Sequence, residues 1–378
     1  MAGEYRQRLS QVKRLVVKVG SSSITYPGGK INLSRLEKLA RELADLHNQG
    51  CEVILVSSGA MAAGLGRLKM KEMPPTIPVK QALAAIGQGA LMQLYEKFFS
   101  EYSQVVAQVL LTRDDFAERV RYLNARNALT ALLELGAIPI INENDTVAVE
   151  EIRFGDNDTL SALVTSIVSA DLLIILTDID GLYDHDPRLH AEAAIISQVT
   201  EIDAKIEANS RTRGSSVSSG GMYTKLQAAR IAMNSGIPMV IARGEEGNIR
   251  RIINGEELGT VFIPRDEKMH ARDRWLAFGS HPQGNIVVDD GAAEAIRIKG
   301  KSLLPSGIVR IEGSFDRGTV VSIIAAQNGE LARGIVNYSS QEIAQIAGHR
   351  SVDIKKILGS KDYDEVIHRN NLALLSIQ

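Results

Sequence analysis

The sequence predicts an α/β domain, with an open and mainly parallel sheet sandwiched by helices, followed by a small, mostly β domain. Three observations support this fold class. Short apolar segments alternate with helical patterns up to about residue 245. From about residue 284, short strand-like segments are instead separated by turns that contain glycine. The length of 378 residues also suits two domains better than one.

Six segments of the first domain are apolar almost throughout, which is typical of strands buried on both faces of a parallel sheet. They are residues 14–20, 52–59, 104–112, 137–144, 171–178 and 237–244. Helical patterns lie between them, at residues 34–50, 78–100, 121–135, 158–170 and 222–235. In the first of these, Ser34 and Glu37 have the spacing of a capping box, and Gly50 follows the expected end.

The second domain is expected at residues 283–361, after a charged linker at 265–282. Its predicted strands are residues 285–290, 295–299, 307–315, 318–324 and 331–339. One short helix follows, for which Ser339 and Glu342 have capping-box spacing. A domain of this size suits a compact β-barrel.

The composition excludes several classes of protein. Lys and Arg total 43 against 45 Asp and Glu, and this near-balance argues against a general nucleic-acid or membrane-surface binder. Cys51 is the one cysteine, so no internal disulfide forms, and a structural zinc site is not expected. Because no apolar segment reaches membrane-spanning length and no signal-peptide core is present, we expect a cytoplasmic protein.

The candidate site follows from a rule of parallel sheets, that ligands bind beyond the carboxyl ends of the strands. Small, polar or charged residues stand at these ends: Lys18 and Gly20, Ser57 and Ser58, the acid-rich stretch 142–158, and Thr177 and Asp178. A glycine-rich loop, 218–225, precedes the last helix of the domain. The stretch "GQGALM" (87–92) begins like a dinucleotide fingerprint, but it lies inside a predicted helix.

Two lysines near glycines favour phosphate binding. Lys18 taken alone also fits a side chain that extends from an edge strand to water, and Lys225 fits a solvated helix residue. Beside Gly20 and the pair Gly220–Gly221, however, both suit a polyanion held by ammonium and backbone N–H groups. Two such cations need an anion to orient them, and Asp158 is placed for this role. Asp156 or Asp158 equally suits a helix cap, and the pair allows one residue for each role.

Several longer motifs carry a resemblance to a known family. They include "VVKVGSSS" (16–23), "VSSGAMAAG" (56–64), "INENDTVAVEEIRFGDNDTLSALV" (141–164), "IILTDIDGLYDHDPR" (174–188) and "GGMYTKLQAA" (220–229). The chain resembles the glutamate 5-kinase family of the amino acid kinase superfamily, in the form with a C-terminal PUA domain. The resemblance covers nearly the whole chain and implies an amino acid kinase domain at 8–264 and a PUA domain at 283–361. The "INENDTV…FGDND" text separates this family from related acetylglutamate, aspartate, carbamate and uridylate kinases.

The resemblance implies a reaction and its partners. The expected activity is ATP-dependent phosphorylation of the L-glutamate γ-carboxylate to L-glutamyl 5-phosphate, the first step of proline biosynthesis, with feedback inhibition by proline. Mg²⁺ is expected to arrive with the nucleotide, without a metal site of the protein. A homo-oligomer (dimer or tetramer) and hand-off of the labile product to glutamyl phosphate reductase are also implied. A sister kinase with another acidic substrate is the nearest alternative.

The resemblance also implies residue roles. Lys18 and Lys225 contact the ATP phosphates, and Asp158 holds both lysines. The residues expected at glutamate are Ser58, Asp145 and Asn157, with Asn142 and Asp156 nearby. Those expected at the nucleotide are Thr177 and Asp178, with the loop Ser219, Gly220, Gly221, Met222, Tyr223, Thr224 and Lys225. Ser219 stands where the family commonly has Thr, and Tyr223 where Ser is usual, which leaves the local fit around the nucleotide open.

RNA binding is a different class of function, since some PUA domains bind RNA. Residues 284–359 contain nine Lys and Arg against eight Asp and Glu, a balance of plus one. An RNA-binding surface is expected to be clearly basic. We therefore expect no nucleic-acid partner and a structural or regulatory role for this domain.

Overall fold

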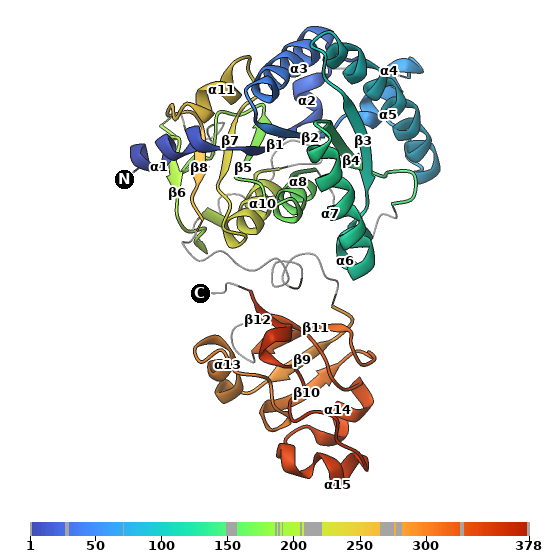
Figure 1. Ribbon diagram of the computed structural model, residues 1–378, viewed down its shortest axis with the longest axis vertical. Coiled ribbons are helices and arrows are strands. Elements are labelled where there is room, and N and C mark those ends of the chain that lie inside the picture. The colour runs from blue at the N-terminus through green and yellow to red at the C-terminus, as the bar shows by residue number, and fades with distance from the viewer. Residues whose placement is uncertain are drawn as a thin grey trace. The chain divides into compact units, whose positions relative to one another are not determined.

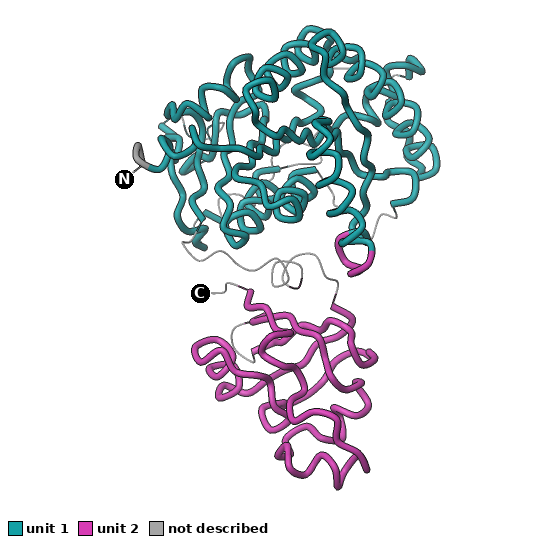
Figure 2. Tube along the Cα trace, viewed as in Figure 1, with its two compact units in different colours: residues 1–115, 121–268 teal, residues 116–120, 269–378 magenta. Residues whose placement is uncertain are grey.

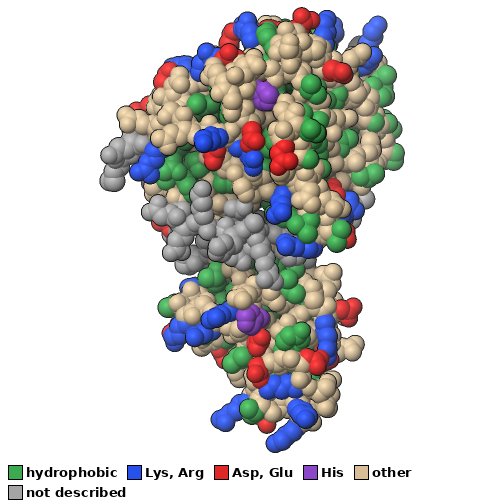
Figure 3. All heavy atoms as spheres, in the orientation of Figure 1, with side chains coloured by type: hydrophobic (Ala, Val, Ile, Leu, Met, Phe, Trp, Pro, Cys, Tyr) green, Lys and Arg blue, Asp and Glu red, His purple; other side chains and the backbone are tan. Residues whose placement is uncertain are grey.

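The computed structural model describes residues 2–26, 30–70, 72–148, 157–185, 187, 190, 192–204, 206–207, 221–264, 276, 282–325 and 329–375. It divides into two compact units, one of residues 1–115 and 121–268 and the other of residues 116–120 and 269–378 (Figure 2). On the face drawn in Figure 3, acidic and basic side chains are interspersed, in keeping with the near-neutral composition. Within the described residues, no helix is both long and apolar enough to span a membrane.

The first unit is built on one eight-stranded sheet, ordered β3-β4-β2-β1-β5-β7-β8-β6. The strands are β1 (Arg14–Val19), β2 (Glu52–Ser57), β3 (Val106–Leu111), β4 (Ile138–Glu143), β5 (Leu172–Thr177), β6 (Gln198–Val199), β7 (Met239–Arg243) and β8 (Thr260–Phe262). All neighbours pair in parallel except β7 and β8. The six strands predicted from the sequence are confirmed, and β1, β2 and β5 are almost wholly buried.

Helices cover both faces of this sheet. They are α1 (Ala2–Arg8), α2 (Ser21–Ile24), α3 (Leu33–Asn48), α4 (Ala60–Arg67), α5 (Ile77–Ser100), α6 (Arg113–Ala117), α7 (Arg119–Glu134), α8 (Asn157–Ile167), α10 (Met222–Asn234) and α11 (Asn248–Ile253). Figure 1 shows α3, α5 and α11 on one side of the strands and α7, α8 and α10 on the other. The predicted fold class of this domain is confirmed.

The predicted cap of α3 is wrong. The helix begins at Leu33, one residue before Ser34, and its N-cap is Asn32, whose side chain accepts a hydrogen bond from the backbone N–H of Arg35 (3.1 Å). Asn is as good an N-cap as Ser, so the earlier residue takes the position. Glu37 instead accepts a hydrogen bond from the hydroxyl of Tyr102 (2.8 Å).

Glycines allow α4 and α5 to pack with their backbones close together. A Cβ on Gly64 would lie 2.0 Å from the carbonyl oxygen of Leu83, and one on Gly87 would lie 1.7 Å from that of Ala60. Real atoms cannot approach so closely, so both positions require glycine. The first glycine of the "GQG" stretch therefore serves helix packing, and the stretch lies inside a helix as predicted. Since α4 starts immediately after the end of β2, this packing also holds the turn at that strand end.

The second unit has its own sheet of five strands, ordered β10-β9-β11-β12-β13. They are β9 (Asn285–Val288), β10 (Ile308–Glu312), β11 (Val320–Ala325), β12 (Gly329–Ile335) and β13 (Leu372–Leu374). All pairs are antiparallel except β9 with β11. The last strand lies beyond residue 361, where the sequence placed the end of this domain. Apolar side chains of this unit form a separate core.

One predicted strand of this unit is a helix. Residues 295–299 were expected to be extended, but residues up to Arg297 belong to α13 (Asp290–Arg297). Asp289 caps this helix by accepting from the backbone N–H of Ala292 (2.7 Å), and the preceding alanines favour helix. The predicted capping box of α14 (Ser340–Ile346), made by Ser339 and Glu342, is confirmed. The short helix α15 (Ile354–Leu358) follows.

Candidate active site

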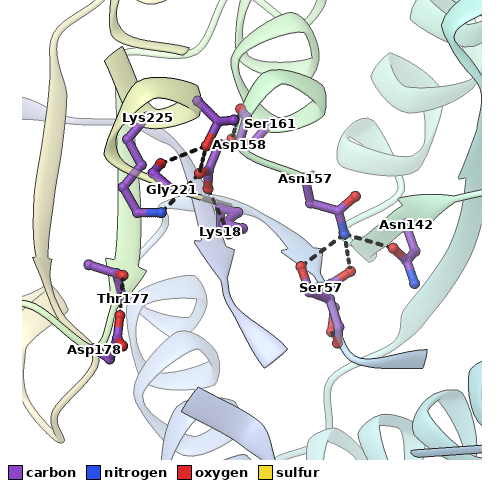
Figure 4. Close-up of polar contacts among 12 residues, drawn as sticks. Lys18, Ser57, Asn142, Asn157, Asp158, Ser161, Thr177, Asp178, Gly221 and Lys225 are labelled. Atoms are coloured by element: carbon purple, nitrogen blue, oxygen red, sulfur yellow. Dashed lines mark hydrogen bonds and ion pairs between the residues drawn. The ribbon is translucent and has the colours of Figure 1, made fainter. Parts of the chain in front are cut away.

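The candidate site lies at the carboxyl ends of four neighbouring strands, in the spatial order β4-β2-β1-β5. The polar residues of these ends are Asn142, Ser57, Lys18 and Thr177. The first turn of α8 meets them with two consecutive residues, Asn157 and Asp158. In Figure 4, the lysines that contact Asp158 lie between Thr177 on one side and the Asn157 cluster on the other.

Asp158 holds two lysines from different elements. Its Oδ1 lies 2.6 Å from Lys18 Nζ on β1, and its Oδ2 lies 3.0 Å from Lys225 Nζ on α10. All three side chains are buried, and Asp158 is 0% exposed. The sequence-based expectation that this acid orients two lysines thus agrees with the geometry, and the alternatives in which either lysine is solvated do not.

The charge state of this triad follows from its surroundings. Burial alone would raise the pKa of Asp158, but the two adjacent ammonium groups outweigh it and hold the pKa of this carboxyl below its ordinary value. The carboxylate is therefore ionised at neutral pH, and the three groups together carry a net charge of plus one. A buried cationic cluster at the strand ends suits a polyanionic ligand.

The start of α10 adds hydrogen-bonding groups beside the triad. Thr224 Oγ1 lies 3.1 Å from Asp158 Oδ2 and 2.8 Å from the carbonyl oxygen of Gly221, the N-cap of the helix. Among the described residues, no atom lies within 4 Å of where a Cβ on Gly221 would be. Met222 and Tyr223 form the first residues of α10, and Tyr223 is exposed. Ser219 and Gly220, predicted in the same loop, lie outside the described residues.

A cluster of carboxamide side chains occupies the other side of the site. Asn157 Nδ2 lies 2.8 Å from the carbonyl oxygen of Ser57, 3.0 Å from Ser58 Oγ and 2.8 Å from Asn142 Oδ1 (Figure 4). Asn157 therefore contacts two other residues predicted at the substrate, Ser58 and Asn142. Asp145 lies in the turn after β4, three residues beyond Asn142. Asp156 lies outside the described residues.

Residues that the sequence did not single out complete this cluster. Gln88, on α5, accepts a hydrogen bond from Asn142 Nδ2 through its Oε1 (2.8 Å). Tyr95, also on α5, shares a hydrogen bond of 2.8 Å with Ser57 Oγ, and burial raises the pKa of this phenol so that it stays neutral. Both side chains come from one face of a helix that is apolar for most of its length, so no local pattern marks them.

The end of β5 forms the third part of the site. Thr177 is buried, and its hydroxyl donates to Asp178 Oδ1 (3.0 Å). Next to it, Asp180 accepts from Arg243 Nε at the end of β7 (2.6 Å) and from the hydroxyl of Tyr183 (3.2 Å). The sequence did not predict this second group, because the pairing joins strands that are far apart in the chain.

Comparisons with known proteins agree with this fold. The model of the amino acid kinase family matches residues 13–243, and that of the PUA domain matches residues 284–358. The chain belongs to the amino acid kinase family. This amino acid kinase is 55% identical over 373 residues to a glutamate 5-kinase of Moorella thermoacetica, covering 98% of this chain and 99% of the relative.

Two further relatives are similar to this chain over nearly its full length. A glutamate 5-kinase of Carboxydothermus hydrogenoformans is 55% identical, covering 98% of this chain and 100% of its own length. One from Geobacter sp. (strain M21) is 50% identical with the same coverage. The resemblance to the glutamate 5-kinases drawn from the motifs is therefore confirmed, as is the PUA domain. This amino acid kinase is a phosphotransferase.

Proposed function

We propose that this kinase transfers the γ-phosphoryl group of ATP to the γ-carboxylate of L-glutamate, giving ADP and L-glutamyl 5-phosphate. The observation that carries the proposal is the start of α8, where one residue holds the amide cluster and the next holds the lysine pair. An acceptor bound at the amides and a nucleotide bound at the end of β5 would meet at the lysines. The names of the full-length relatives support glutamate as the acceptor.

The main task of the site in this reaction is electrostatic. The γ-carboxylate of glutamate, with a pKa of about 4.3, is already the nucleophile at neutral pH, so no general base is required. The difficulty is to bring a carboxylate to a phosphate, because both are anionic. Lys18, Lys225 and the backbone N–H groups at the start of α10 supply the positive potential for an in-line approach. As the phosphoryl group moves, charge builds up on its oxygens, where the two ammonium groups stabilise it.

Mg²⁺ fits this site as an ion carried by the nucleotide. Both oxygens of Asp158 are engaged by lysines, so this carboxylate does not fit the role of a metal ligand. Within the described ranges, no group of three or more His, Cys, Asp or Glu side chains has metal-binding spacing. Magnesium commonly keeps several waters and binds substrate phosphates. When bound there, it neutralises part of the charge on the phosphate oxygens.

The first test is an acceptor panel. ATP-dependent formation of a hydroxamate in the presence of hydroxylamine reports an acyl phosphate. We expect a strong signal with glutamate and a far weaker one with aspartate, whose shorter side chain misplaces the attacking carboxylate; a misplacement of about 1 Å costs on the order of a hundredfold in rate. The signal with N-acetylglutamate should also be weak, because its acylated α-nitrogen carries no positive charge. Equal turnover of aspartate would contradict the assignment of the acceptor.

Asp145 is the proposed partner of the α-ammonium group of glutamate. Asp145→Asn keeps the shape of the side chain and removes its charge. A charge-assisted hydrogen bond contributes about 1.5–3 kcal/mol, so the KM for glutamate is expected to rise about tenfold or more while the KM for ATP hardly changes. Initial rates at varied glutamate and ATP measure both.

The matched control is Asp114→Asn, which removes an exposed acid of the neighbouring α6. This variant should keep both KM values. If Asp145→Asn lowered kcat alone, Asp145 would belong to the transfer step rather than to acceptor binding.

Further expectations belong to the same proposal. The product would enter proline biosynthesis, and hand-off to glutamyl phosphate reductase would protect a labile acyl phosphate. Feedback inhibition by proline would act at or near the glutamate site, through the loop 146–154, of which residues 146–148 are described. Competition between proline and glutamate in initial rates tests this. A homo-oligomer, a cytoplasmic location and a PUA domain without a nucleic-acid partner complete the proposal.

A further inference from the structure

Two backbone groups fix the orientation of the carboxamides in the amide cluster. The N–H of Glu143 only donates, and it lies 2.9 Å from Asn142 Oδ1, so this atom is the amide oxygen. The carbonyl oxygen of Ser57 only accepts, and it lies 2.8 Å from Asn157 Nδ2, so that atom is the amide nitrogen. The bond from Asn157 Nδ2 to Asn142 Oδ1 agrees with both assignments.

The orientation of the Asn142 amide also fixes the orientation of the Gln88 amide. Since Asn142 Oδ1 faces Asn157, the Nδ2 group of Asn142 faces Gln88 and donates to its Oε1 (2.8 Å). The amide oxygen of Gln88 is therefore engaged, and its Nε2 group retains two N–H donors. No hydrogen bond from Nε2 to another described residue is present, and the side chain is half-buried, so this donor remains accessible to a ligand.

Gln88 also lies at the β4 end of the site, away from the lysines. Its partner Asn142 is on β4, and β2 separates β4 from β1, which carries Lys18. In Figure 4, Asn142 is on the side of Asn157 that faces away from the lysines. A group of the acceptor that contacts Gln88 is therefore remote from the migrating phosphoryl group.

We propose that Gln88 is a substrate-binding and specificity-determining residue, whose Nε2 donates a hydrogen bond to the α-carboxylate of the acceptor. This inference rests on the proposed function, in which the γ-carboxylate is directed to the lysines and the α-end stays near β4. Asp145 follows the same strand, so the ammonium and carboxylate of the α-carbon have one partner each. The rigid contact of Gln88 Oε1 with Asn142 holds the donor in place.

Gln88→Glu separates this role from a purely structural one. The carboxylate keeps an oxygen that accepts from Asn142 Nδ2, so the amide cluster remains intact. It replaces the donor toward the substrate by an anionic acceptor. If Gln88 only positioned Asn142, this variant would resemble the wild type. If Gln88 binds the α-carboxylate, the KM for glutamate is expected to rise at least tenfold, with the KM for ATP unchanged.

The decisive comparison uses isoglutamine, which carries an α-carboxamide and a free γ-carboxylate. The wild type should prefer glutamate strongly. In Gln88→Glu the new carboxylate accepts from the α-carboxamide, so the ratio of kcat/KM for glutamate to that for isoglutamine should fall at least tenfold. Gln93→Glu is the matched control, an exposed residue on the same helix, and should keep the wild-type ratio.

Each outcome decides the inference. An unchanged ratio and an unchanged KM for glutamate in Gln88→Glu would overturn it, while wild-type turnover of glutamate would leave the proposed function standing. A wild type that forms no γ-glutamyl hydroxamate would overturn the proposed function itself. If Gln88→Glu fails to fold, Gln88→Met, which offers neither donor nor acceptor, replaces it. That variant should lose most of the discrimination between the two acceptors, and retention of the full wild-type ratio would overturn the inference.

Discussion

Asp158→Asn is expected to lower kcat about 100-fold or more, with smaller changes in the KM for glutamate and for ATP. The variant leaves Lys18 and Lys225 without the carboxylate that holds each of them within 3.0 Å, so neither ammonium group is fixed where charge builds up during transfer. Loss of one preorganised electrostatic contact commonly costs 10²–10³ in kcat. Steady-state kinetics at varied concentrations of both substrates separates the rate effect from the binding effect.

The same variant should be less stable. Two buried ammonium groups without an anion are unfavourable, and removing one partner of a buried charge cluster costs about 3–5 kcal/mol. Urea unfolding measures this loss. Because the pKa of Asp158 is lowered in the folded protein, its stabilising effect is full above the unfolded pKa of about 4 and is lost as the pH falls through the folded value. The stability gap between wild type and variant should therefore be large at pH 7 and shrink in acid.

The control for Asp158→Asn is a second Asp→Asn variant at an exposed position. Asp114→Asn removes an exposed carboxylate and should change neither kcat nor stability by a measurable amount. If Asp158→Asn raised only the KM for glutamate and left kcat intact, Asp158 would be an acceptor-binding residue and its role in orienting the lysines would be wrong.

Gly87→Ala is expected to destabilise the first unit by about 3 kcal/mol or more. The added Cβ would lie 1.7 Å from the carbonyl oxygen of Ala60 and 2.5 Å from the backbone nitrogen of Gly64, so α4 and α5 must move apart. Since α4 follows directly on the turn of Ser58, the KM for glutamate should also rise. Urea unfolding and initial-rate kinetics measure the two effects.

Gly89→Ala is the control for this substitution. Gly89 lies on the same helix, two residues away, and no atom of the described residues lies within 4 Å of the new Cβ. Alanine has the higher helix propensity, so this variant should be more stable than the wild type by about 0.5–1 kcal/mol. A stable, active Gly87→Ala would contradict the close packing of α4 on α5.

Much of the fold was predictable because buried parallel strands are apolar throughout. The continuous runs that form β1, β2 and β5 needed no tertiary information. The short strands β6 and β8 were missed, because two or three residues are too few to show a pattern. Residues 295–299 were misassigned because Ile296 and Ile298 alternate as in a strand, although the cap at Asp289 starts a helix.

The site was predictable where charge sets the arrangement. Two lysines at glycine-rich turns require an anion, and the sequence alone indicates Asp158. The amide cluster was predictable in part, since the family resemblance implied places for Asn142 and Asn157 at the acceptor. Gln88 was not, because its role depends on a hydrogen bond across 54 positions of sequence and on the polarity of two other amides. Such an orientation exists only in the folded protein.

The central claim is that the γ-carboxylate attacks the γ-phosphorus of ATP directly at the lysine pair. Glutamate labelled with ¹⁸O at both γ-carboxylate oxygens tests it, with hydroxylamine added to capture the product. In direct transfer, one labelled oxygen forms the bond to phosphorus, and attack of hydroxylamine at the acyl carbon releases it with the phosphate. The account predicts that the inorganic phosphate released with the hydroxamate carries one ¹⁸O. Unlabelled phosphate would contradict it.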